Sequence, residues 1–335
     1  MQSHPPVMST PATDRSTDRD AAGHYVCPPR LLVRAAARGP QPMVVAAAGA
    51  DDVMQAVHWA ASLGLITPIL VGDPAAIKAS CATLDDPDTP YRVIAATGEE
   101  QAAQIAADLI AAGEAPLLMK GHLHTDTLMR AVLDGARGLR RAARLSHIFA
   151  MHIPGSAREL LITDAALNIA PDPRTMTFIV RHAIEVAMVL GIDHPRIALL
   201  SATETINRSM PSSIAAAAFA ASFKDEAESK FCHISGPLAL DVALSAAAAT
   251  LKGLTNDPVA GQADILVVPN IETGNALFKA LVHWLHATPI GVVLGAAMPI
   301  ILTSRADPVE AKLASIALGC LLVEPSVADR LSNTT

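Results

Sequence analysis

The part of the sequence that decides the fold is Ala263–Gly319, which reads ADILVVPNIETGNALFKALVHWLHATPIGVVLGAAMPIILTSRADPVEAKLASIALG. It contains three short, apolar, β-branched runs, each typical of a buried strand: Ile265–Pro269, Ile290–Gly295 and Ile300–Thr303. Helical patterns follow the first and third runs. This alternation of strands and helices favours an α/β protein.

The helical pattern after the first run covers Ala276–His286, where apolar residues recur at helical spacing. Asn270–Asn275 precedes it as a polar turn with one glycine, Gly274, and Asn275 is the expected N-cap. Lys279 lies one helical turn beyond Asn275, so both side chains are predicted on the same side of the helix.

The junction after the third run favours an anion site. Asp307 is the expected N-cap, Pro308 the first helical residue and Glu310 the third, which makes a capping box in a helix that Gly319 would end. Free N–H groups, the helix dipole and Arg305 would then converge on an anion beside Ser304. The alternative is that the carboxylates only cap the helix and that Arg305 is a solvated surface charge.

The same alternation continues through the rest of the chain. Further strands are predicted over Met43–Ala47, Thr67–Gly72, Tyr91–Ala95, Pro116–Lys120, Ser146–Ile153, Leu160–Asp164, Arg196–Ser201 and Phe231–Ser235. Further helices are predicted from Pro74 and over Asp51–Leu63, Glu99–Ala112, Asp126–Asp134, Pro173–Leu190, Pro211–Phe223 and Leu238–Leu251. The early βαβα order predicts a parallel sheet with helices on both faces, and 146–153 and 160–164 are predicted to pair.

Length and composition suggest the domain organisation. The chain has 335 residues, which suits about two domains. Residues 1–29 are rich in Ser, Thr, Pro, Asp and Arg without apolar periodicity, which predicts a disordered tail. Gly135–Arg144 is expected to be a turn or hinge. Domain I is therefore predicted to comprise residues 30–144 and 299–330, and domain II residues 145–298.

Charge, hydropathy and cysteine spacing exclude several classes of protein. The net charge of -7 argues against nucleic acid as the main partner. No run reaches the roughly 18 apolar residues of a membrane span, and no signal-peptide pattern begins the chain. The four cysteines are scattered without paired spacing, so reduced thiols and a cytoplasmic location are predicted.

Common catalytic motifs are missing from the sequence. It has no G-x-G-x-x-G after a strand, no P-loop and no G-x-S-x-G. Cys232 and His233 are neighbours in a predicted strand, so their side chains point to opposite faces and do not make a nucleophilic pair. Two histidine pairs have possible metal spacing but no accompanying carboxylate motif, so no metal is predicted: His122 with His124, and His283 with His286.

A series of short blocks resembles the phosphate acetyltransferase/phosphate butyryltransferase family over roughly Met43–Gly319. In chain order the blocks are Met119–Gly121, Asp126–Arg130, Leu161–Asp164, Pro171–Pro173, Leu200–Glu204, Gly236–Asp241, Pro269–Lys279 and Ser304–Arg305. The form of the 236–241 block looks closer to the butyryl branch. The order and spacing of the blocks carry the resemblance, since each block is weak by itself.

The resemblance implies a two-domain, three-layer α/β/α fold like that of isocitrate and isopropylmalate dehydrogenases, with a cleft between the domains. It implies a homodimer that transfers a short acyl group, acetyl or butyryl, reversibly between coenzyme A and inorganic phosphate. Coenzyme A is then a substrate, and no bound cofactor or metal is needed. The implied catalytic residues are Ser304 and Arg305, with Asp307 or Glu310 as a base. The implied phosphate- and coenzyme A-binding residues are Lys120, Gly121, Arg130, Asn270, Gly274, Asn275 and Lys279.

Three points stay open at this stage. The acetyl branch has an Asp seven residues beyond the Ser, where this chain has Ala311, so Asp307, Glu310 or the phosphate dianion itself is left as the base. Asp164 and Asp241 are expected to be structural more often than catalytic. Two other functions share the fold: an acyl-CoA-sensing regulatory domain, and a metal-dependent decarboxylating dehydrogenase.

Overall fold

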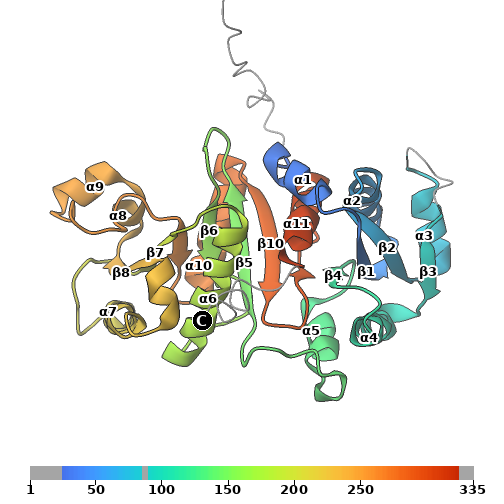
Figure 1. Ribbon diagram of the computed structural model, residues 1–335, viewed down its shortest axis with the longest axis horizontal. Coiled ribbons are helices and arrows are strands. Elements are labelled where there is room, and N and C mark those ends of the chain that lie inside the picture. Colours follow the sequence, from blue (N-terminus) through green and yellow to red (C-terminus); the bar gives the residue numbers. More distant parts are fainter. Residues whose placement is uncertain (1–24, 85–89, 324–335) are drawn as a thin grey trace, which may run out of the picture.

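The computed structural model describes residues 25–84 and 90–323, which form one continuous mixed sheet with helices packed on both faces (Figure 1). In this part of the chain the strands, in sheet order, are β3 (Arg92–Ala95), β2 (Ile66–Gly72), β1 (Gln41–Ala48), β4 (Leu117–Lys120), β11 (Ile300–Ile301), β10 (Thr288–Leu294), β5 (Ser146–His152), β6 (Leu160–Thr163), β9 (Ile265–Val267), β7 (Arg196–Leu200) and β8 (His233–Leu238). The predicted α/β class is confirmed.

The sheet consists of two parallel blocks joined through two antiparallel strands. β3, β2, β1, β4 and β11 form one block, and β6, β9, β7 and β8 form the other. β10 and β5 lie between them, each antiparallel to both of its neighbours. The β5–β6 ladder confirms the predicted strand pair. The first block comes from the predicted domain I and all other strands from the predicted domain II, but the division into two domains stays a prediction.

Helices connect the strands. The α-helices of the described residues are α1 (Pro29–Ala36), α2 (Asp51–Ser62), α3 (Pro74–Cys81), α4 (Gly98–Ala111), α5 (Thr125–Leu133), α6 (Pro173–Val189), α7 (Pro211–Phe223), α8 (Leu240–Leu244), α9 (Ala246–Leu251), α10 (Ile271–Leu285) and α11 (Val309–Leu322). Short 3-10 turns lie at Gly135–Arg137 and Ala227–Phe231.

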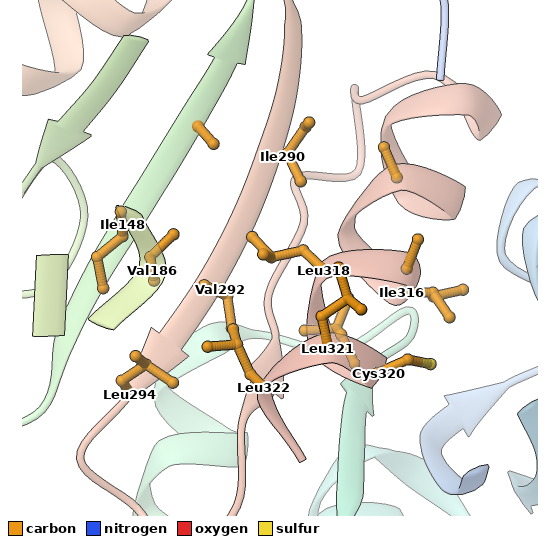
Figure 2. Close-up of a cluster of buried hydrophobic side chains, with 14 of the residues drawn as sticks. Ile148, Val186, Ile290, Val292, Leu294, Ile316, Leu318, Cys320, Leu321 and Leu322 are labelled. Carbon is orange, nitrogen blue, oxygen red and sulfur yellow. The ribbon is translucent and has the colours of Figure 1, made fainter. Parts of the chain in front are cut away.

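Helix α11 packs in the middle of the core. Residues 311–322 are all buried, and its leucines lie beside the apolar side chains of β10 (Figure 2). Gly319 lies inside this helix, so the prediction that Gly319 ends it is wrong. A Cβ on Gly319 would lie 3.0 Å from Cδ1 of Ile301, and the glycine therefore allows the helix to approach β11 closely.

Two helix starts differ from the predictions. α10 begins at Ile271, and Asn270 is its N-cap, accepting a hydrogen bond from the Thr273 N–H at 2.9 Å. The predicted polar turn and the Asn275 cap are therefore wrong. α11 begins at Val309 after Pro308 without a side-chain cap, so the predicted Asp307–Glu310 capping box is also wrong.

The predicted helix over Leu238–Leu251 is two helices, α8 and α9, separated at Ser245. The Ser245 hydroxyl accepts a hydrogen bond from the Ala248 N–H at 3.3 Å and caps α9. The serine thus gives the backbone a local partner that starts a new helix, which overrides the helical propensity of the alanine run.

Contacts with the rest of the protein begin before residue 30, where the predicted tail was expected to end. Residues 1–24 of the predicted tail lie outside the described residues. The Val26 N–H donates to Thr288 Oγ1 at 3.0 Å, Cys27 is buried, and α1 starts at Pro29. The four cysteines are free thiols, and none of the helices that the structure describes is long and apolar enough to cross a membrane.

Candidate active site

The turn after β11 presents Ser304 and Arg305 to solvent. The Asp307 carboxylate accepts a hydrogen bond from the Ser304 N–H at 2.7 Å, and the Asp307 N–H donates to the Ser304 carbonyl at 3.2 Å. These two bonds close a tight turn and leave both the Ser304 hydroxyl and the Arg305 guanidinium at the surface. Asp307 therefore shapes this turn, and it does not cap α11.

The end of β4 lies next to this turn, because Met119 pairs with Ile301 in the parallel β4–β11 ladder. Lys120 is buried, and its ammonium group lies 3.3 Å from the carbonyl oxygens of both Gly121 and Leu123. Burial lowers the pKa of Lys120, and the charges of Arg305 and Lys312 lower it further. Lys120 and Arg305, both predicted site residues, thus lie at or just beyond the carboxyl ends of the adjacent strands β4 and β11.

Gly121 is required by the close approach of the chain to β1. A Cβ at this position would lie 2.4 Å from the carbonyl oxygen of Ala47, whereas real Cβ atoms do not come so near. The Gly121 N–H donates to the Ala46 carbonyl at 2.8 Å. Gly121 therefore allows the chain after Lys120 to pass over the end of β1.

Lys312 is a buried cation beneath the turn, and it was missed by sequence reasoning. Its ammonium group donates to the Asp307 carbonyl and lies 2.9 Å from a carboxylate oxygen of Asp52 on α2. Burial raises the pKa of Asp307, while the Ser304 N–H and the charges of Lys312 and Lys120 oppose that rise. Lys312 falls on a helix pattern that otherwise reads as apolar, so its position in the sequence gave no signal of this contact.

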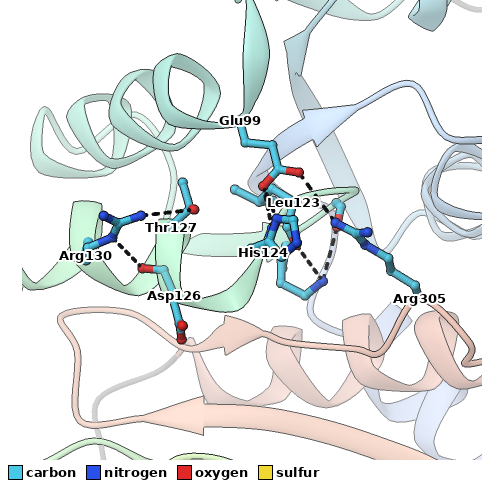
Figure 3. A network of polar contacts seen from close by, with 9 residues as sticks. Glu99, Leu123, His124, Asp126, Thr127, Arg130 and Arg305 are labelled. Carbon is cyan, nitrogen blue, oxygen red and sulfur yellow. Dashed lines mark hydrogen bonds and ion pairs between the residues drawn. The ribbon is translucent and has the colours of Figure 1, made fainter.

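Glu99 joins the turn to the loop after β4. It lies in the first turn of α4, and one carboxylate oxygen accepts from both the backbone N–H and the Nδ1 of His124, each at 2.7 Å. Its other oxygen lies 3.5 Å from a guanidinium nitrogen of Arg305 (Figure 3). The hydrogen bonds from His124 hold the pKa of Glu99 below its usual range. Glu99 was not among the predicted site residues, and His124 was considered only as a metal ligand.

Arg130 lies on α5, the helix that begins directly after His124. Its guanidinium donates to the Asp126 carbonyl at 3.3 Å and to Thr127 Oγ1 at 3.4 Å, and the side chain is exposed. Figure 3 shows Arg130 and Arg305 on opposite sides of the Glu99–His124 pair. The N-cap of α5 has no side-chain hydrogen bond, so the N–H groups of Thr125 and Asp126, unlike that of Thr127, are available to an anion.

Glu310 is placed apart from these residues. The pKa of the Cys27 thiol is raised to about 12 by burial and, secondarily, by the charge of Glu310. Among the described residues, Glu310 has no hydrogen bond or ion pair. Ala311 is fully buried. Of the two predicted carboxylates, the structure thus brings Asp307 but not Glu310 into contact with the Ser304–Arg305 turn.

The remaining predicted binding residues lie on α10, except Asn270, which directly precedes the helix. Asn270 caps the helix, and Gly274 is buried, where a Cβ would lie 2.9 Å from Cα of Ala165. Asn275 and Lys279 are exposed, one helical turn apart, and make no hydrogen bond or ion pair within the described chain. Their binding role therefore stays a prediction.

A buried aromatic row connects α10 with the segment between β11 and Ser304. Phe278 stacks on Phe149 with ring centroids 4.0 Å apart, and Phe149 lies 4.1 Å from the ring of His147. His147 Nε2 is 3.1 Å from the carbonyl oxygen of Leu302, two residues before Ser304. Burial lowers the pKa of His147, which keeps the ring neutral.

Asp164 contributes to the same region as a structural residue. Its carboxylate accepts hydrogen bonds from the backbone N–H groups of His147, Ala166 and Leu167 and from the side chain of Asn168, at 2.6 to 3.1 Å. A carboxylate with this many partners is occupied in holding the loop after β6. This agrees with the structural role expected from the sequence.

The sequence was compared with known protein families and with individual proteins. Residues 88–320 match the family described as Phosphate acetyl/butaryl transferase. The chain is 43% identical to phosphate acetyltransferase of Rhizobium meliloti over 87% of this chain and 92% of that protein. It is 36% identical to phosphate butyryltransferase of Clostridium acetobutylicum over 87% of this chain and 96% of that protein.

Solved structures agree with these sequence matches. A branched-chain phosphotransacylase from Enterococcus faecalis superposes with a TM-score of 0.74 at 35% identity, covering 85% of this chain and 99% of that one. A phosphotransacetylase from Streptococcus pyogenes has the same fold, with a TM-score of 0.75 at 19% identity and coverage of 88% and 98%. The chain therefore belongs to the phosphate acetyltransferase/phosphate butyryltransferase family.

Proposed function

We propose that this protein is a phosphate acyltransferase, which transfers a short acyl group reversibly between coenzyme A and inorganic phosphate. The observation that carries the proposal is the convergence of Arg305, Lys120 and the exposed Ser304 hydroxyl at the ends of β11 and β4, within a chain of this family. Cations at the carboxyl ends of adjacent parallel strands are suited to an anionic substrate.

The reaction requires phosphate to approach a thioester carbonyl. Arg305 holds the phosphate charge through its forked donors, and Arg130 on α5 is proposed as a second phosphate or coenzyme A contact. The Ser304 hydroxyl is proposed to donate to the oxyanion of the tetrahedral intermediate. Attack of a phosphate oxygen on the carbonyl carbon breaks the C–S bond and gives an acyl phosphate and the coenzyme A thiolate.

The predicted binding residues on and beside α10 are assigned to the coenzyme A site. Asn275 and Lys279 are exposed on one face of α10, and a lysine ammonium suits the phosphates of coenzyme A. Asn270 and Gly274 support that helix through its cap and its close packing. The cleft between the two predicted domains would then bring these residues toward Arg305.

No bound cofactor or metal is proposed to take part, and coenzyme A enters as a substrate. The length of the acyl group is left open, since relatives named for both acetyl and butyryl transfer match the chain at similar coverage. One methylene contributes only about 1–3 kcal/mol to discrimination, so both substrates deserve measurement.

A homodimer in the cytoplasm is also proposed. Large apolar side chains are exposed on α8, α9 and α10: Leu240, Leu244, Leu251 and Trp284. Exposed apolar side chains of this kind are suited to contact with a second copy of the chain. The cytoplasmic assignment is supported by the four free cysteines. A monomeric mass by light scattering, or recovery of the protein outside the cytoplasmic fraction, would contradict these two assignments.

The function is tested by phosphate-dependent release of free thiol from acyl-CoA esters, from acetyl to valeryl, with and without a chelator. We expect rapid release that requires phosphate and is insensitive to the chelator, with acyl phosphate as the second product. Absence of phosphate-dependent release with every ester would contradict the proposal. A requirement for a divalent metal would favour the dehydrogenase alternative instead.

A further inference from the structure

The Glu99–His124 pair defines one tautomer of the histidine. An ionised carboxylate only accepts hydrogen bonds, so the 2.7 Å contact between Glu99 and Nδ1 places a proton on Nδ1. In the neutral ring, Nε2 then carries a lone pair and is able to accept a proton. The His124 side chain is 71% exposed, and no described residue bonds to Nε2, so this nitrogen is open to a ligand.

The position of His124 connects it with the proposed phosphate site. The carboxylate of Glu99 contacts His124 through one oxygen and Arg305 through the other. Figure 3 shows the histidine between Arg130 and Arg305. A phosphate or thioester held by Arg305 would therefore lie close to a histidine that donates to Glu99 from its backbone N–H and from ring Nδ1, so that its ring orientation is already fixed.

The other groups that sequence reasoning offered as a base fit less well. Glu310 makes no hydrogen bond or ion pair with the described residues of the Ser304–Arg305 turn, and Ala311, which stands at the family's Asp position, has no ionisable group. Asp307 accepts the Ser304 N–H through one carboxylate oxygen and so holds its own turn. His124 is thus an exposed titratable side chain beside Arg305 whose acceptor atom is unoccupied.

We propose that His124 is the proton-transfer residue of the acyltransferase, and that Glu99 is the positioning residue that fixes its tautomer. The inference rests on the function proposed above. In the direction of acyl-CoA, Nε2 takes the proton of the coenzyme A thiol, and the sulfur attacks the carbonyl carbon of the acyl phosphate. The bond from that carbon to the phosphate oxygen breaks, and phosphate leaves with its electron pair and takes the proton from the His124 imidazolium. In the reverse direction, Nε2 takes the proton of the attacking hydrogen phosphate, and the leaving thiolate takes that proton from the His124 imidazolium.

The test compares His124→Ala with His122→Ala, a matched control two residues earlier in the same loop, whose exposed side chain makes no hydrogen bond or ion pair with a described residue. Steady-state rates are measured in both directions for the full-length variants. His124→Ala is expected to lower kcat by about 100-fold, the range for losing a general acid–base residue. KM values and the melting temperature should stay near those of the wild type, and added imidazole should restore much of kcat. His122→Ala should behave as the wild type.

Glu99→Gln is the second variant of this test, and it addresses the positioning role of Glu99. The amide removes the charge that favours the Nδ1–H tautomer, so kcat should fall by about tenfold while imidazole gives no rescue, because the ring is still present. This pattern differs from that of His124→Ala, in which the ring itself is missing.

The outcomes separate the two proposals. A wild-type protein without phosphate-dependent activity would remove the proposed function and this inference together. An active wild type with a fully active His124→Ala would overturn this inference and leave the function standing. A slow His124→Ala that imidazole does not rescue, or one with a raised KM and unchanged kcat, would show a binding or structural role and would also overturn it.

Discussion

At the scale of single residues, one carboxylate determines the shape of the turn that presents Arg305. Asp307 accepts from the Ser304 N–H and is itself contacted by Lys312 through its carbonyl oxygen. Glu310 has neither kind of contact among the described residues, and its charge contributes to the raised pKa of Cys27. Two carboxylates that stand three positions apart in the sequence therefore have different surroundings.

This difference predicts different effects of two substitutions. Asp307→Ala removes the acceptor that closes the turn, so we expect turnover to fall at least about tenfold, because Arg305 and Ser304 lose their fixed position. Glu310→Gln should leave turnover within about twofold of the wild type, since it removes no contact to the turn. Turnover and thermal melting of both variants are measured at saturating phosphate. A slow Glu310→Gln beside a normal Asp307→Ala would reverse the assignment.

Residue patterns predicted part of this site. Ser304 and Arg305 were predicted from their place after a strand, and Lys120 and Gly121 from the family resemblance. All four lie at or after the ends of adjacent parallel strands, which meet at one edge of a sheet. The Glu99–His124 contact was not found, because it joins the starts of two helices 25 positions apart. Nothing in the local sequence of either residue encodes that contact, which depends on how α4 and α5 pack together.

At the scale of elements, the strand and helix types followed from apolar periodicity, whereas helix starts depended on packing. The start of α10 was misplaced because Gly274 reads as a turn residue. In the structure, Gly274 lies within the helix because a side chain there would collide with Ala165. Gly319 was misread in the same way, since it marks the close approach of α11 to β11. Glycine in these helices reports contact with a neighbouring element, which the sequence by itself does not reveal.

At the scale of the whole molecule, β5 and β10 join the two parallel blocks, and buried histidines lie along this junction. His147 contacts the Leu302 carbonyl, and His182 Nδ1 lies 2.7 Å from the Ser146 hydroxyl. Burial lowers the pKa of His182 to about 4, with a smaller contribution from the charge of Arg181. The junction therefore contains groups that are neutral in the folded protein.

These groups predict that stability falls in mild acid. Below the ordinary histidine pKa of about 6.5, the unfolded chain takes up protons that folded His182 does not bind until the pH nears its own lower pKa. The free energy of unfolding should therefore decrease between pH 7.5 and 5.5, by about 1 kcal/mol for His182. Urea unfolding at the two pH values, for the wild type and His182→Gln, measures this contribution. An equal decrease in both proteins would show that His182 does not contribute.

The central claim is that Arg305, on the turn after β11, holds the phosphate that accepts the acyl group. The most direct measurement is the rate of acyl phosphate formation from acyl-CoA and phosphate by Arg305→Ala. Arg92→Ala is the control, since Arg92 pairs with Glu114 on another part of the surface. We expect Arg305→Ala to lose about two orders of magnitude in turnover with little change in melting temperature, the range for removing a key electrostatic contact, and Arg92→Ala to match the wild type. Near-normal turnover by a folded Arg305→Ala would contradict the account.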